Sequence, residues 1–136
     1  MHDALSNIVE LFEFSDESMR MELLVGFGDT LPPLDADAAA LRDAGEHLVH
    51  ECQSPVFFFP RIDEADVLHI HTDVPREAAV ARGFVGLLQQ AFDGEPAGVL
   101  DSAPDDLLDA CGLTRLLTMR RQRGLRAIYE RLLTVR

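Results

Sequence analysis

The hydrophobic pattern of this sequence changes twice along the chain, and these changes limit the folds open to it more than any other feature. In the first third and the last half, apolar residues recur with the period of an amphipathic helix. Between them lie three short apolar or alternating runs, at residues 48–49, 56–59 and 67–72. These runs predict three short strands. Residues 63–66 have the length of a hairpin turn, so at least the second and third strands should be antiparallel.

Proline and glycine divide the helical parts into separate segments. We expect helices at residues 3–13, from Ser15 to Gly28, after Pro75 up to Gly94, and along a final stripe that ends within three residues of the C-terminus. Residues 35–46 predict a short helix or an irregular crossing, and residues 96–100 and 104–111 predict short helical turns. In the helix after Pro75, the small residues Gly83 and Gly86 would allow another segment to pack closely.

The assembled order is helices, a small sheet, then helices. With 136 residues and 47% hydrophobic composition, the chain has the size and apolar content of one domain spanning residues 1–136. We therefore expect an α+β fold in which helices cover one face of a small three-stranded antiparallel sheet.

The charge balance excludes several classes of partner. The net charge is −12 at pH 7, which argues against nonspecific binding to nucleic acid or to anionic membranes. A basic patch could form from five arginines near the C-terminus, but no aromatic residues interleave with them as in a nucleic-acid surface; they are Arg115, Arg120, Arg121, Arg123 and Arg126. No membrane-length apolar run or signal-peptide pattern is present, so a soluble, cytoplasmic protein is expected.

Two cysteines are candidates for chemistry. Cys52 falls in a polar loop between predicted strands, which fits either a reactive thiol or a half-buried structural one. Cys111 lies in an apolar turn and is predicted to belong to the core. His47 and His50 lie near Cys52, but a zinc site needs three or four ligands and no such pattern exists, so no metal site is expected.

The third predicted strand carries a second polar group. His69, His71 and Asp73 share one of its faces by the period of two. Such a trio resembles a ligand set, but we favour a solvated face, since a sheet covered on one side should alternate in this way.

Four motifs together carry a family resemblance over residues 20–134. Glu-Cys-Gln-Ser-Pro-Val at residues 51–56 resembles the Gly-Cys-Gln-Ser-X-Val motif of SufE-like sulfur acceptors. The segments at residues 31–34, 82–84 and 121–125 resemble the family's Leu-Pro-X-Leu, Lys/Arg-Gly-Leu and Arg-X-X-Gly-Leu motifs. The main departure is Glu51, which replaces the family's glycine and adds a negative charge beside the thiol.

The resemblance implies a function in sulfur transfer. Cys52 would accept persulfide sulfur from a pyridoxal-phosphate-dependent cysteine desulfurase and pass it to an iron–sulfur scaffold, and Arg121 would stabilise the thiolate or persulfide anion. Such a protein activates its partner rather than acting as a stand-alone enzyme, and has no cofactor of its own. The resemblance also makes partner-contact candidates of four residues, which are Glu51, Gln53, Ser54 and Glu77.

Two further expectations accompany this prediction. Phe57 and Leu31 are candidates for the apolar residues that would protect the thiol until a partner docks. The alternative function is a non-catalytic interaction module of the same fold, which would dock on a desulfurase or another partner without chemistry at Cys52.

Overall fold

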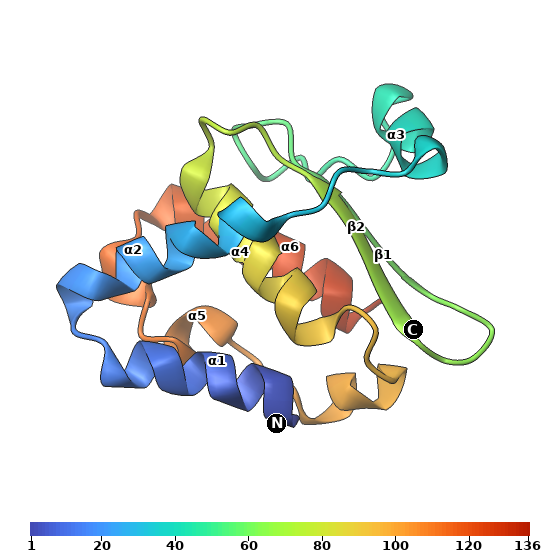
Figure 1. Ribbon diagram of the computed structural model, residues 1–136. Coiled ribbons are helices and arrows are strands. Elements are labelled where there is room, and N and C mark those ends of the chain that lie inside the picture. Colours follow the sequence, from blue (N-terminus) through green and yellow to red (C-terminus); the bar gives the residue numbers. More distant parts are fainter.

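A hairpin of two antiparallel strands lies along one side of a group of helices (Figure 1). The computed structural model describes all 136 residues. Strand β1 spans Phe57–Ile62 and β2 spans Leu68–Asp73, in a register that pairs Phe57 with Asp73 and Ile62 with Leu68. The predicted antiparallel hairpin is therefore confirmed.

The prediction of a third strand was wrong. Leu48 forms only an isolated bridge with Phe57, and two backbone hydrogen bonds extend it, from Val49 N–H to the Val56 carbonyl at 2.9 Å and from Phe58 N–H to the His47 carbonyl at 3.1 Å. His47 has a φ of 58°, a left-handed backbone that no strand continues through. The apolar run at 48–49 is thus too short, and too sharply bent at its start, to become a strand.

Helices form the rest of the fold, and the predicted helical segments are confirmed. The α-helices are α1 (Asp3–Phe14), α2 (Glu17–Gly26), α3 (Ala36–Asp43), α4 (Ala79–Phe92), α5 (Leu107–Ala110) and α6 (Met119–Leu133). Three 3₁₀ turns lie between these helices in the chain, at Phe27–Thr30, Ala97–Ser102 and Thr114–Leu116. None of the helices combines the length and the apolar character that crossing a bilayer requires.

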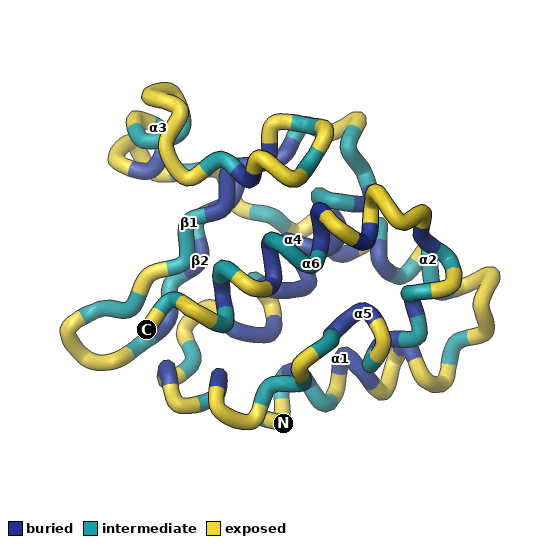
Figure 2. The backbone as a smooth tube through the Cα atoms, turned by 180° about the vertical axis from the view of Figure 1, so that it is seen from behind, coloured by how far each residue is buried: buried dark blue, intermediate teal, exposed yellow.

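Helix α4 runs through the middle of the molecule, and most of its residues are buried (Figures 1 and 2). Its two glycines pack against backbone, as predicted. A Cβ at Gly83 would lie 2.2 Å from the Leu24 carbonyl oxygen, and a Cβ at Gly86 would lie 2.2 Å from the Phe27 carbonyl oxygen. Only glycine allows this approach of α4 to α2 and the turn that follows it.

Helices α4 and α6 contact the hairpin, α4 against β2 and α6 against β1. On β2 the inward residues Leu68, Ile70 and Thr72 are buried, whereas the alternate residues are partly exposed. This alternation is typical of a sheet with one covered face. The small, mostly exposed helix α3 lies beyond one end of the hairpin, away from the central helices (Figures 1 and 2).

The polar residues of the outer face of β2 each have a separate partner. His69 Nε2 lies 2.7 Å from Asp63, His71 Nε2 accepts a hydrogen bond from Arg61 at 3.1 Å, and Asp73 pairs with Arg42 at 2.8 Å. Each of the three side chains thus contacts a different partner, and the three do not converge on one point. No group of three or more His, Cys, Asp or Glu side chains converges as metal ligands would.

Candidate functional site

The loop that carries Cys52 is fixed at both ends. Val49 N–H bonds to the Val56 carbonyl, so the chain enters and leaves the loop as a paired segment, and Cys52 N–H donates to the Val49 carbonyl at 3.1 Å. From α6, Arg131 Nη2 donates to the Leu48 carbonyl at 2.8 Å. The loop is thus held in place from the sheet side and from the last helix.

The thiol of Cys52 lies against α6 at Gly124. A Cβ at Gly124 would lie 2.9 Å from the sulfur, and 3.5 Å from the Cys52 Cα and from the Glu51 carbonyl oxygen. Gly124 is buried and Cys52 is half-buried. The helix therefore offers bare backbone where the sulfur rests.

A hollow of about 140 Å³ opens in front of the thiol. The loop, the start of α4 and the start of α6 form its walls, and it is lined by Cys52, Gln53, Ser54, Glu77, Ala78, Val80, Ala81, Arg120, Arg121, Gly124 and Leu125. The structure therefore brings Cys52 and Arg121 together with the candidates Gln53, Ser54 and Glu77. Glu51 adjoins this hollow but is exposed and does not line it.

The environment of Cys52 favours its neutral form. Burial raises the pKa of this thiol above its ordinary value of 9.0, and the charge of Glu51 raises it further. The charge of Arg131 lowers the pKa of Cys52 and so opposes both effects. The unbound protein thus keeps Cys52 largely as a thiol at neutral pH.

Arg131 was missed by reasoning from the sequence. It lies ten residues beyond Arg121 on the opposite part of the last helix, and no motif marks it. Its relation to the loop depends on the packing of α6, which only the folded structure shows. The side chain of Arg121 is exposed at the rim of the hollow, where its role toward an anion stays a prediction.

The other predictions about apolar surroundings have different outcomes. Cys111 is 1% exposed, and burial raises the pKa of its thiol to about 12, so its assignment to the core is confirmed. Phe57 is also buried, but neither it nor Leu31 lines the hollow. The apolar side chains that line the hollow are instead Ala78, Val80, Ala81 and Leu125.

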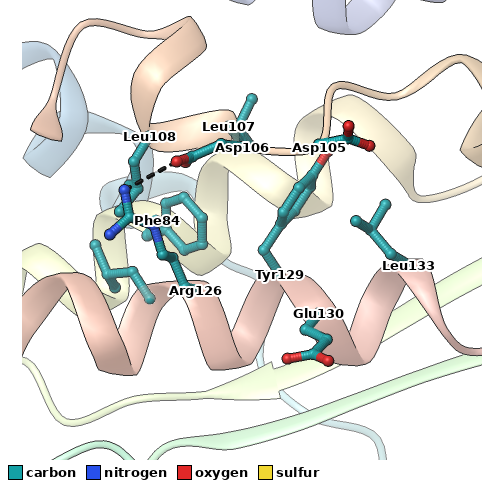
Figure 3. A pocket seen from close by; sticks show the side chains of 10 residues that line it. Phe84, Asp105, Asp106, Leu107, Leu108, Arg126, Tyr129, Glu130 and Leu133 are labelled. Carbon is teal, nitrogen blue, oxygen red and sulfur yellow. Dashed lines mark hydrogen bonds and ion pairs between the residues drawn. The ribbon is translucent and has the colours of Figure 1, made fainter.

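A larger hollow of about 340 Å³ lies between α5 and α6, and Leu125 lines both hollows. Figure 3 shows Arg126 and Tyr129 extending from α6 toward residues 105–108. Arg126 pairs with Asp106 at 2.9 Å, and the Tyr129 hydroxyl donates to the Pro104 carbonyl at 2.6 Å. This larger hollow is lined by no cysteine or histidine, so the smaller hollow beside Cys52 is the better candidate for chemistry.

The fold and the hollow define an α+β protein with a half-buried cysteine on a loop held between a hairpin and its last helix. The chain belongs to the SufE family, since the family model described as "SufE: Fe-S metabolism associated domain" matches residues 6–135. This family is associated with iron–sulfur metabolism.

Individual relatives agree with this assignment. An uncharacterized SufE-like protein of Mycobacterium tuberculosis is 30% identical over 128 residues, which cover 94% of this chain and 87% of that protein. One from Synechocystis is 27% identical over 132 residues, covering 96% and 78%. A solution structure of a hypothetical protein from Thermus thermophilus is 28% identical, with a TM-score of 0.77, and covers 97% of this chain and 92% of that one.

Proposed function

We propose that this protein accepts sulfur on Cys52 from a pyridoxal-phosphate-dependent cysteine desulfurase, stimulates that enzyme, and passes the sulfur to iron–sulfur cluster assembly. The observation that carries the proposal is the hollow itself. It gathers Cys52, Gln53, Ser54, Glu77 and Arg121 from three separate segments of a SufE-family chain. The cytoplasmic location and the identity of the downstream scaffold stay predictions.

The transfer is a thiol–persulfide exchange. The Cys52 sulfur attacks the outer sulfur of the desulfurase persulfide, a new S–S bond forms at Cys52, and the S–S bond of the desulfurase breaks. The electron pair of that broken bond stays on the desulfurase cysteine, which takes up the proton lost by Cys52. The exchange moves one sulfur atom and needs no added oxidant or reductant.

The polar and charged residues around the hollow can both stabilise the reacting sulfur and contact the desulfurase. Arg120 and Arg121 lie at its rim, where a guanidinium can stabilise a developing sulfur anion. Glu77 also lines the hollow and is exposed, and with Gln53 and Ser54 it offers polar contacts to a docking partner. Because its pKa is raised, Cys52 enters the encounter mostly as the protonated thiol, and the proton leaves as the sulfur reacts.

One observation favours the second candidate function, a docking module without chemistry. The same raised pKa, with Glu51 contributing, makes Cys52 a weak nucleophile in the unbound protein. Such a module would bind a desulfurase through the surface around the hollow and leave the thiol unmodified.

Alanine release separates the two candidates. A purified cysteine desulfurase is mixed with cysteine and without an added thiol reductant, and the alanine that it forms alone, with substrate cysteine as the acceptor thiol, is subtracted. The wild-type protein should produce extra alanine in proportion to its amount, whereas C52S should produce none while still binding the desulfurase. Equal stimulation by wild-type protein and C52S would favour the docking module and overturn the acceptor function.

A further inference from the structure

At the contact between α6 and the Cys52 loop, the sulfur is the atom that comes closest to Gly124. A Cβ on Gly124 would lie 2.9 Å from Sγ, closer than real side-chain carbons approach sulfur. It would lie 3.5 Å from the Cys52 Cα and the Glu51 carbonyl oxygen, which is ordinary van der Waals contact. A methyl group at this position would therefore conflict with the thiol and spare the loop backbone.

The helix cannot move away to relieve that conflict. Gly124 is a buried residue of α6, next to the core residue Leu125, and α6 packs against α4, α5 and β1. The cysteine side chain, in contrast, can rotate about one bond into another rotamer. The thiol is thus the group that would yield.

We propose that Gly124 is a positioning residue for Cys52: its missing side chain provides the seat on which the sulfur rests and keeps the hollow open for the second sulfur of a persulfide. The part that concerns the persulfide rests on the proposed function. The part that concerns the seat of the thiol does not.

The walls of the hollow fit this assignment. The less exposed residues that line it include the apolar Ala78, Ala81 and Leu125, whereas the charged Glu77, Arg120 and Arg121 are exposed and mark the rim. A sulfur on the seat is therefore partly withdrawn from water and from dissolved thiols. A dissolved thiol that reached a persulfide on Cys52 would attack its outer sulfur, leave Cys52 as a free thiol and carry the sulfur to the wrong acceptor.

The size of the side chain at position 124 then sets how far Cys52 is protected. In Gly124→Ala the sulfur leaves the seat and becomes more exposed. Because burial is the largest cause of the raised pKa, the pKa of Cys52 should fall toward its ordinary value.

The test compares the pH dependence of Cys52 alkylation by iodoacetamide in wild-type protein, G124A and the control G26A. Gly26 is exposed, and a Cβ there meets no atom within 4 Å. Peptide mass spectrometry follows Cys52 separately from Cys111. We expect G124A to be alkylated several-fold faster at pH 7–8, with its profile shifted to lower pH, whereas G26A should match the wild type.

Superimposable profiles for G124A and the wild type, with thermal unfolding showing G124A folded, would overturn the proposal. Should G124A not fold, the seat is tested in the native chain by NMR. Alkylation of Cys52 should then shift the Gly124 amide resonance and leave that of Gly26 unchanged, and an unchanged Gly124 resonance would likewise overturn the proposal.

The persulfide part has its own measurement. Wild-type protein and G124A are loaded with sulfur by a desulfurase and cysteine, then challenged with glutathione, and the bound sulfur is followed by mass spectrometry. G124A should lose its sulfur several-fold faster, and equal rates would overturn this part. The alkylation profile uses no desulfurase, so failure of the acceptor function would show as absent loading with the alkylation difference intact.

Discussion

At Cys52, burial and two charged neighbours determine how reactive the sulfur is. Burial and the Glu51 carboxylate raise the pKa of the thiol, and the Arg131 guanidinium lowers it. Glu51 stands where the motif that this segment resembles has glycine, and its carboxylate adds an unfavourable charge beside a group that must become an anion to react. The arginine that offsets it comes from the far part of α6 and also binds the loop through the Leu48 carbonyl.

Replacing Glu51 should therefore make Cys52 a better nucleophile. In E51Q the pKa of Cys52 falls because a negative neighbour is removed, so alkylation at a fixed pH below that pKa becomes faster. The pH–rate profile checks this, with E64Q as a control, because Glu64 is an exposed carboxylate that does not contribute to the pKa of Cys52. A profile of E51Q that coincides with that of E64Q would contradict this account of the site.

At the level of elements, the sequence predicted what depends on local pattern. Periods of apolar residues located the helices, and the length of the 63–66 turn located the hairpin. The third strand failed because a left-handed backbone at His47 interrupts the run, a conformation that no periodicity reveals. Motif resemblance located the residues of the hollow, but Arg131 and the contact at Gly124 depend on how α6 packs, which neither pattern nor motif encodes.

The close contact between α2 and α4 gives a prediction about stability. In Gly83→Ala the new Cβ would overlap the Leu24 carbonyl, so backbone must move, at a cost of about 1–3 kcal/mol. G26A, where a Cβ meets open space, should be neutral or stabilising by up to about 1 kcal/mol through helix propensity. Urea unfolding measures both, and an equally stable G83A would contradict the close packing.

At the level of the whole molecule, one core connects the hairpin with all the α-helices except α3, and it contains a second thiol. Cys111 is 1% exposed, and burial raises its pKa to about 12 from 9.0. Well below pH 9 this thiol is protonated in both the folded and the unfolded chain, so it does not make stability depend on pH there. Above pH 9 the unfolded chain ionises first, and folding loses free energy until the pH passes the folded pKa.

The free energy of unfolding should consequently fall as pH rises from about 9 to about 12, with Cys111 contributing up to about 1.4 kcal/mol per pH unit. Cys111→Ala should flatten this dependence, at a cost of about 1 kcal/mol at neutral pH from lost burial. Urea unfolding at several pH values checks both effects. Equal alkaline slopes for the two proteins would contradict the burial of an un-ionised thiol.

Sulfur uptake at Cys52 is the central claim, and intact-protein mass spectrometry after incubation with cysteine and a purified cysteine desulfurase tests it most directly. We predict a gain of one or more sulfur atoms that a reductant removes and that maps to Cys52, retained in Cys111→Ala and absent in Cys52→Ser. No gain in wild-type protein, under conditions where a complex with the desulfurase is demonstrated, would contradict the acceptor function.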